Sequence, residues 1–227
     1  MRFKDVFSII GPSMVGPSSS HTAGAARLGR VARQLLGETP TRAEIVFYGS
    51  FADTYRGHGT DLAIVGGLLD WATDDLRIAQ SLRYAEEAGL QVTIKAGKAV
   101  TAHPNTAKIA LSGATRSVEL IGASIGGGNI EVHAVDGFDV KFIAMYPTLC
   151  VYHKDRPGML AEMTATLSRA GVNIGHMDVD RKGRNGEALT VIEVDTPISA
   201  ELLAQMRRLQ DVSDVRLVDL EAGGAVL

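Results

Sequence analysis

A serine-rich loop near the N-terminus, Gly-Pro-Ser-Ser-Ser-His-Thr at residues 16–22, leads into a segment whose apolar residues recur at helical spacing. A polar loop at a helix N-terminus presents unpaired backbone N–H groups, hydroxyl donors and the positive end of the helix dipole. We therefore predict that a substrate carboxylate binds to this loop. The residues that would contact it are Ser18, Ser19, Ser20 and Thr22. The alternative is that Ser19 or Ser20 only caps the helix.

Three of the six histidines, His21, His58 and His103, lie in segments flanked by glycine or proline, which predicts loops. Histidine can exchange protons near neutral pH or orient a substrate, so each one is a candidate for proton transfer. We rank His21 first, and the sequence alone does not single out the general base. The three histidines lack the tight spacing of metal ligands, which disfavours a metal site.

Two further features of the sequence, at residue 61 and at residues 126–128, have both a chemical and a structural interpretation. Asp61 could orient His58, or it could start a helix. The sequence Gly126-Gly127-Gly128 permits the close approach of a ligand or partner chain, because glycine has no Cβ and accepts positive φ, or it forms a tight turn. The chain has neither a Gly-x-Gly-x-x-Gly motif after a strand nor a P-loop lysine, so nucleotide binding is not predicted.

These residues fall in a first block, residues 1–147, in which helices and strands are mixed. Helices are predicted from the serine-rich loop to Gly37, over 60–71 and over 74–88. Strands are predicted over 44–48, near 92–94, and over 118–123, 130–135 and 140–144. The pattern predicts an α+β domain and leaves the order of its strands open.

The second block, residues 148–227, has a more legible order of elements. A strand around Val151 precedes the sequence Asp-Arg-Pro-Gly at 155–158, and a helix follows that ends at Gly171. Asn185-Gly186 predicts a hairpin between the next two strands, and a second helix and a last strand complete the order βαββαβ. This order predicts a ferredoxin-like fold. The predicted core residues are Cys150, Met159, Met163 and Met206.

Composition narrows the possible functions. With 227 residues, 45% of them apolar, the chain is long enough for two small domains. The net charge of −3, with no long run of one sign, predicts neither nucleic acid nor a membrane as a partner. The N-terminus does not resemble a signal peptide and no segment could span a bilayer, so we expect a cytoplasmic protein. The single cysteine excludes an intramolecular disulfide and a four-thiolate metal site built from this chain.

Five motifs, in this order, resemble the β part of bacterial iron–sulfur L-serine dehydratases. They are the serine-rich loop, Tyr48-Gly49-Ser50, Gly57-His58-Gly59-Thr60-Asp61, His103-Pro104-Asn105 and Ser124-Ile125-Gly126-Gly127-Gly128. The second block resembles an ACT domain in its Asp-Arg-Pro-Gly loop and in Asn173-Ile174 at the start of its second strand. In that family the β part resembles the allosteric substrate-binding domain of some D-3-phosphoglycerate dehydrogenases.

The resemblance implies a subunit of an enzyme that converts L-serine to pyruvate and ammonia. A [4Fe-4S] cluster would be held by cysteines of a partner α subunit, where its Lewis-acidic iron can take the substrate hydroxyl. This chain would hold no metal and would be inactive alone. The implied catalytic residues are His21, His58 and His103. The implied substrate-binding residues are the serines and Thr22 of the serine-rich loop, with Asp61, Asn105, Ser124, Gly126 and Gly127.

The ACT resemblance further implies a serine-responsive site at the interface of a homodimer formed through ACT domains. Gly158 would let a ligand approach the backbone at a helix N-terminus, and Asn173 could contact the amino group of the effector. The predicted effector-binding residues are Asp155, Arg156, Pro157, Gly158, Met159, Leu160, Asn173 and Ile174. The alternative is an ACT domain that binds nothing.

Two other functions are alternatives to this interpretation. A non-enzymatic amino-acid sensor with an ACT domain has a compatible fold, but a sensor has no need of a histidine directed at its ligand. A dehydratase that uses pyridoxal phosphate finds little support, since no lysine lies in an obvious cofactor-binding context and the chain is short for such a fold.

Overall fold

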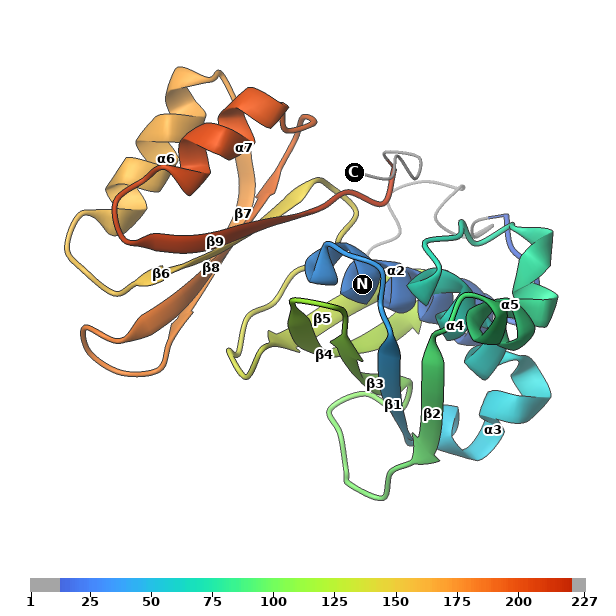
Figure 1. The fold of residues 1–227 in the computed structure, drawn as a ribbon. Coiled ribbons are helices and arrows are strands. Elements are labelled where there is room, and N and C mark those ends of the chain that lie inside the picture. Colours follow the sequence, from blue (N-terminus) through green and yellow to red (C-terminus); the bar gives the residue numbers. More distant parts are fainter. Residues whose placement is uncertain (1–12, 222–227) are drawn as a thin grey trace. The chain divides into compact units, whose positions relative to one another are not determined.

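The computed structural model describes residues 13–221, which divide into two compact units between Asp136 and Gly137 (Figure 1). Residues 1–12, which do not resemble a signal peptide in sequence, lie outside the described part. Among the described helices, none has both the length and the apolar character needed to cross a membrane.

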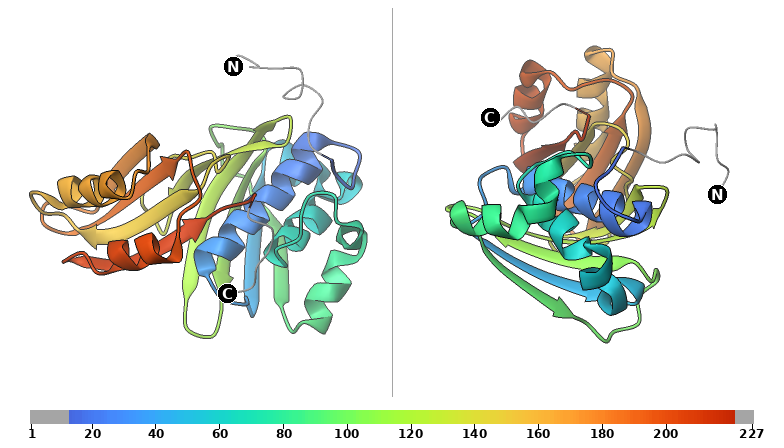
Figure 2. Two further views of the ribbon diagram at one scale, coloured as in Figure 1. Left: turned by 90° about the horizontal axis from the view of Figure 1, so that it is seen from above. Right: turned by 90° about the vertical axis from the view of Figure 1, so that its right-hand side faces the viewer.

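The first unit is built on a five-stranded sheet in the order β2-β1-β3-β4-β5, in which only the β1–β2 pair is parallel. Helices α2, α4 and α5 lie on one face of this sheet (Figure 2). The strands are β1 (Arg42–Tyr48), β2 (Gln91–Ala96), β3 (Thr106–Ser112), β4 (Ser117–Gly126) and β5 (Asn129–Val135). The helices are η1 (Ser19–Ala23), α2 (Gly24–Leu36), α3 (Ser50–His58), α4 (Thr60–Leu68), η2 (Leu76–Gln80) and α5 (Ser81–Glu87). The predicted α+β class is confirmed.

Helix α2 packs closely against α4 because each helix has a glycine at the crossing. A Cβ on Gly29 would lie 2.2 Å from the carbonyl oxygen of Ile64, and a Cβ on Gly67 would lie 2.1 Å from that of Ala26. Both distances are far below van der Waals contact, so any larger residue would force the helices apart. This crossing holds the start of α4 beside the serine-rich loop that leads into α2.

Three elements of the first unit differ from the sequence prediction. Residues 50–58, predicted as a loop, form helix α3, so His58 is the last residue of a helix. The predicted helix over 74–88 is divided into η2 and α5. Strand β3 was not predicted, although its residues Ala107, Ile109 and Leu111 are buried in strict alternation.

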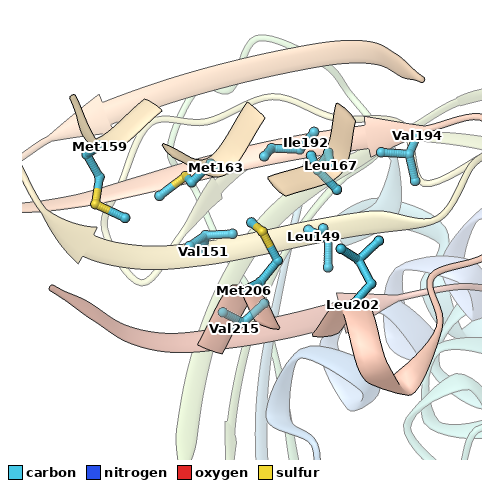
Figure 3. Close-up of a cluster of buried hydrophobic side chains, with 10 residues drawn as sticks. All are labelled: Leu149, Val151, Met159, Met163, Leu167, Ile192, Val194, Leu202, Met206 and Val215. Carbon is cyan, nitrogen blue, oxygen red and sulfur yellow. The ribbon is translucent and has the colours of Figure 1, made fainter. Parts of the chain in front are cut away.

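The second unit has a four-stranded antiparallel sheet in the order β7-β8-β6-β9, with α6 and α7 on one face (Figure 1). Its elements follow the predicted order: β6 (Thr148–Lys154), α6 (Met159–Arg169), β7 (Ile174–Arg181), β8 (Glu187–Val194), α7 (Ala200–Arg207) and β9 (Val212–Val218). Buried side chains from the helices and the sheet form its core, and these include the three methionines predicted there (Figure 3). Cys150 is buried in β6, as predicted.

Residues 137–144 form a segment, here called the strap, that contributes no strand to either sheet and has only isolated β-bridge residues, at Phe138 and Phe142. Its residues Phe138, Val140, Phe142 and Ala144 are buried, and this alternation produced the strand-like pattern in the sequence. The backbone N–H groups of Asp139, Lys141 and Ile143 bind side-chain carboxylates of β7 and β8, so no continuous strand ladder forms here. The predicted strand over 140–144 is therefore wrong. The second compact unit begins at Gly137, ahead of the strand at Thr148 where the second sequence block starts.

Candidate functional site

The serine-rich loop ends in the wide turn η1, which continues directly into α2. This turn has π-helical hydrogen bonding, a rare geometry that occurs frequently at functional sites. Ser18 caps the turn: its Oγ accepts the backbone N–H of His21, and its carbonyl oxygen accepts the backbone N–H of Thr22. The capping residue is therefore Ser18, and not Ser19 or Ser20 as the sequence suggested, because those two serines lie inside the turn.

Thr22 is the member of the loop that is least available to a ligand. Its side chain is buried, and its hydroxyl donates to the carbonyl oxygen of Ser18. Gly16 covers it so closely that a Cβ at Gly16 would lie 2.3 Å from the Thr22 methyl carbon. The half-buried residues Ser18, Ser19 and Ser20 are therefore the part of the loop that a carboxylate can reach.

His21 and His58 form an edge-to-face pair, with ring centroids 4.8 Å apart and an interplanar angle of 81°. The Nδ1 of His21 lies 3.3 Å from the Oγ of Ser18, and its Nε2 lies 3.3 Å from the Oγ of Ser50. The ring of Phe51 packs against the same imidazole at 5.2 Å. Helix α3 thus places its first residue, Ser50, and its last, His58, against His21.

The two rings differ in how their nitrogens are used. Both nitrogens of His21 face hydroxyl oxygens, whereas neither nitrogen of His58 has a hydrogen-bond partner among the described residues, and its Nδ1 is buried. Burial, together with the neighbouring His58, lowers the pKa of His21 below the ordinary histidine value. The lowered pKa favours the neutral form of His21, and a positive charge on one ring disfavours a charge on the other.

Asp61 lies in the first turn of α4, and burial raises the pKa of its carboxyl group. Its Oδ1 accepts the backbone N–H of Leu62 at 2.9 Å, and no hydrogen bond joins it to His58. Two roles were predicted for Asp61, to orient His58 or to start a helix. The structure agrees with the second role, because Asp61 lies in the first turn of α4.

His103 lies on a loop that docks onto the start of α3. The backbone N–H of Phe51 donates to the carbonyl oxygen of Pro104 at 3.4 Å. Gly49, with φ 54°, lies so near this loop that a Cβ would be 2.6 Å from the same oxygen. The Nδ1 of His103 accepts the backbone N–H of Asn105 at 3.1 Å, so the neutral ring carries its proton on Nε2. The loop thus contacts Phe51, whose ring packs on His21. The His103 ring itself forms no hydrogen bond to His21 or His58.

Ser124 joins β4 to both the His103 loop and the start of α2. Its backbone N–H donates to the carbonyl oxygen of Asn105 at 3.0 Å, and a Cβ on Gly24 would lie only 2.1 Å from its Oγ. The hydroxyls of Ser124 and Thr60 are buried and have no hydrogen-bond partner among the described residues. Beyond Ser124, residues 126–128 all have positive φ: Gly126 ends β4, and Gly127 and Gly128 form the turn to β5, which agrees with the structural interpretation of the glycines.

Ser50 and Phe51 contact His21 but were not singled out as site residues from the sequence. The available signal was the motif Tyr48-Gly49-Ser50, whose serine follows a strand directly. Because residues 50–58 were predicted as a loop, the sequence did not show that one short helix connects Ser50 to His58.

The Asp-Arg-Pro-Gly loop of the second unit is held by ion pairs within that unit. Asp155 binds Arg181 at 2.8 Å, and Arg156 binds both Glu162 and Asp211 at 2.8 Å. The hydrogen bond from Arg181 lowers the pKa of Asp155, and Glu162, followed by Asp211, raises the pKa of Arg156. These two charged side chains therefore stabilise the loop.

The remaining predicted effector residues differ in their exposure. Gly158 has φ 85° as the N-cap of α6, a conformation that strains any residue with a Cβ. Pro157 and Leu160 are exposed, whereas Met159 is buried in the core. Asn173 donates a side-chain N–H to Asp195 at 2.6 Å, which leaves its side-chain oxygen as the group that can accept a hydrogen bond from a ligand.

Two family models match this chain. The model described as serine dehydratase beta chain matches residues 3–99, and the ACT domain model matches residues 148–211. The first match covers the serine-rich loop, the His21–His58 pair and Asp61. The second covers all the residues predicted to bind an effector.

Individual proteins align over nearly the whole chain. The probable L-serine dehydratase, beta chain, of Bacillus subtilis is 47% identical over 95% of this chain and 98% of its own length. The L-serine dehydratase, beta chain, of Peptoniphilus asaccharolyticus is 33% identical over 94% and 97%. A D-3-phosphoglycerate dehydrogenase of Methanocaldococcus jannaschii is 26% identical over 86% of this chain and 37% of that protein, as the predicted resemblance implies. This chain therefore belongs to the family of L-serine dehydratase β chains.

Proposed function

We propose that this chain is the β subunit of an L-serine dehydratase and that it binds the substrate and removes its α-proton during conversion to pyruvate and ammonia. The observation that carries the proposal is the edge-to-face pair of His21 and His58 beside a helix N-terminus lined by serines. This arrangement supports the proposal because the imidazole rings can accept protons and lie next to a helix N-terminus that can bind a carboxylate, and a β-elimination from an amino acid uses both.

The substrate carboxylate binds at the turn formed by Ser18, Ser19 and Ser20 in this proposal. Backbone N–H groups in the first turn of a helix have no carbonyl partner within the helix, and the helix dipole favours a negative charge there. The serine hydroxyls add further donors. A carboxylate held at this turn would place the α-carbon of the substrate near the histidine pair.

His58 is the best candidate for the general base. Hydroxyl groups lie within hydrogen-bond distance of both ring nitrogens of His21, and one nitrogen of His103 is taken by its own loop. His58 keeps its nitrogens free of partners among the described residues. In this assignment the neutral ring of His21 packs against His58 and orients it, and His58 accepts the α-proton of serine.

The residues of this chain do not fit an iron–sulfur cluster, because Cys150 is the single cysteine and is buried in β6. The groups of histidine, cysteine and acidic residues in the described part contain no metal-binding set. We therefore assign the [4Fe-4S] cluster to a partner α subunit, where it would supply the Lewis acid for the departing hydroxide. The Bacillus subtilis and Peptoniphilus asaccharolyticus relatives are named as β chains, which supports a partner of this kind.

The ACT unit is proposed to bind L-serine as a regulatory ligand, within a homodimer formed through the ACT domains. The exposed backbone around Gly158 would bind the carboxylate, and the side-chain oxygen of Asn173 would accept a hydrogen bond from the ammonium group. Asp155 and Arg156 would act indirectly, by holding the loop in shape through their ion pairs.

Anaerobic reconstitution of this chain with the α subunit tests the proposed activity. The wild-type complex should convert L-serine to pyruvate, and His58→Asn should lower kcat by roughly 1000-fold, the range expected when a general base is lost. The matched control is His133→Asn, since His133 lies on β5 and pairs with Glu131. A wild-type complex that binds L-serine without forming pyruvate would favour the amino-acid sensor, and equal rates for His58→Asn and wild type would exclude His58 as the base.

A further inference from the structure

The strap is held along β7 by side-chain carboxylates in a regular pattern. The backbone N–H of Asp139 donates to Asp180 and that of Lys141 donates to Asp178, both at 2.8 Å. The residue numbers rise along the strap as they fall along β7, so the strap runs antiparallel to this edge strand. Each carboxylate takes the place that a backbone carbonyl would take in a sheet.

The far end of the strap is held by Glu193 and His176. Glu193 is 4% exposed and accepts the backbone N–H groups of Ile143 at 3.2 Å and Ala144 at 3.0 Å. The Nε2 of His176 lies 3.0 Å from the carbonyl oxygen of Lys141 and donates to it. Ala144 has φ 50°, a conformation that a residue with a Cβ keeps only where surrounding contacts fix it. The strap is thus fixed along its whole length.

The near end of the strap follows directly on the last residue of the first unit, Asp136. Asp136 forms two hydrogen bonds with Glu119 of β4, one through its backbone N–H and one through its carboxylate, both at 2.8 Å. Asp139 is already bound to the second unit through Asp180. Gly137 and the buried Phe138 are the residues between these two hydrogen-bonded positions, so two residues of the chain separate the anchored strap from the first unit.

The strand that holds the strap also begins at the proposed effector site. Asn173 and Ile174 are followed by an irregularity in the β7–β8 pairing, and His176 comes directly after it. A ligand that moves Asn173 or Ile174 therefore acts on His176 within a few residues along one strand. A coupling between two sites requires such a contiguous element that both sites can bias.

We propose that the strap, residues 137–144, is the element through which ligand binding at the ACT domain alters the serine dehydratase domain. The inference rests on the proposed function in taking L-serine as the effector. Asp178, Asp180 and Glu193 fix the strap to the ACT unit, and loss of that anchoring should remove the effect of the ligand without changing the catalytic residues.

Hydrogen–deuterium exchange of the wild-type chain, with and without L-serine, tests the strap independently of catalysis. We expect L-serine to change the exchange of the strap amides. The double variant Asp178→Ala/Asp180→Ala should exchange these amides about tenfold faster, because two charge-assisted hydrogen bonds are lost. Asp214→Ala is the matched control, since Asp214 lies on β9 at the opposite edge of the same sheet.

The same variants in the reconstituted α–β complex test the coupling. The double variant should keep the maximal rate of pyruvate formation and lose the regulatory part of its dependence on L-serine concentration. An insertion of two glycines after Gly137 lengthens the connection to the first unit and leaves every anchoring hydrogen bond of the strap in place. It should therefore cause the same loss of the regulatory response. This variant replaces the double variant if the double variant does not fold. A full response to L-serine in the insertion variant would overturn the proposal, as would strap amides that do not respond when L-serine binds the ACT domain. A wild-type complex without activity would contradict the proposed function instead, and the exchange experiment would still test the strap.

Discussion

Two helix N-termini in this chain begin with loops that contain proline and glycine, yet their polar groups are used in different ways. At the serine-rich loop, the His58 ring and the hydroxyls of Thr60 and Ser124 lack hydrogen-bond partners among the described residues. At the Asp-Arg-Pro-Gly loop, Asp155 and Arg156 are held in ion pairs with residues of the same unit. Buried polar groups without partners are costly, and they occur where a ligand or a reaction uses them.

This difference in how the two loops use their polar side chains indicates a division of labour: the two units have different roles, one in the reaction and one in regulation, as the proposed function assumes. In the proposed function the first loop keeps side chains available for chemistry, so substitutions there should change the rate of reaction more than the stability. The second loop uses its side chains to hold its own backbone, so substitutions there should act on stability and regulation.

The largest effect is expected from His21→Asn in the reconstituted complex. His21 packs on His58 and contacts Ser18 and Ser50, and its neutral ring orients the proposed base. We expect kcat to fall by about 100-fold, with a much smaller change in KM, as for the loss of a group that supports proton transfer. Steady-state assays of pyruvate formation measure this. A fall in thermal stability with an unchanged kcat would show that His21 is a structural residue.

Gly24→Ala should have the next largest effect, on folding rather than on the reaction step. The added Cβ would lie 2.1 Å from the Oγ of Ser124, inside a fully buried contact. We expect the free energy of unfolding to fall by about 2 kcal/mol, the usual result of overpacking a core. Gly57→Ala is the control, because its Cβ would meet no atom within 4 Å and alanine favours a helix. Equal denaturation midpoints for the two variants would contradict the close packing of α2 on β4.

In the second unit, Glu193→Ala should lower the free energy of unfolding by about 1–2 kcal/mol, because two buried N–H groups of the strap lose their acceptor. Burial raises the pKa of Glu193, so the folded state binds its proton more tightly than the unfolded state does. Its contribution to stability therefore falls as pH rises from the ordinary glutamate value through the raised value. Glu193→Gln keeps an acceptor oxygen and should flatten this dependence in urea unfolding measured over a pH series. An unchanged slope would show that Glu193 does not titrate in this range.

Arg156→Ala should have the smallest of these effects. It removes the ion pairs with Glu162 and Asp211 near the surface, and exposed ion pairs contribute little. We expect a small drop in melting temperature, larger than for Arg42→Ala because the side chain of Arg42 is 63% exposed and pairs with one carboxylate. The regulatory response to L-serine should weaken in Arg156→Ala and stay unchanged in Arg42→Ala. A normal response would show that the loop keeps its shape without these pairs.

The fold of the second unit could be predicted because its turns are explicit in the sequence. Asn185 and Gly158 both have positive φ at the positions where a hairpin turn and a helix start were expected. The strap could not be predicted, because alternating burial along 137–144 has the same pattern in a segment held by carboxylates as in a strand. The sequence of the strap does not show whether the backbone N–H of a residue such as Lys141 binds a side-chain carboxylate, here that of Asp178, or a backbone carbonyl of a neighbouring strand.

The candidate site was predicted as a set of residues but not as an arrangement. The motifs identified His21, His58 and His103, and the structure brings the first two into contact. The pairing depends on helix α3, which has two glycines at its ends and one buried residue, Phe51, so its helical periodicity is weak. Within the described part of the chain the Nδ1 of His58 has no hydrogen-bond partner, whereas both ring nitrogens of His21 face hydroxyl oxygens, and only the three-dimensional contacts show this difference.

The division of labour is tested most directly by the rate of pyruvate formation as a function of L-serine concentration, measured for wild type, His58→Asn and Gly158→Ala in the reconstituted complex. Gly158 has φ 85°, so alanine there strains the second loop without touching the first. The account predicts that His58→Asn loses activity at every concentration, whereas Gly158→Ala keeps the maximal rate and loses the regulatory response. A Gly158→Ala enzyme that loses its maximal rate as His58→Asn does, or a His58→Asn enzyme that keeps its maximal rate, would contradict it.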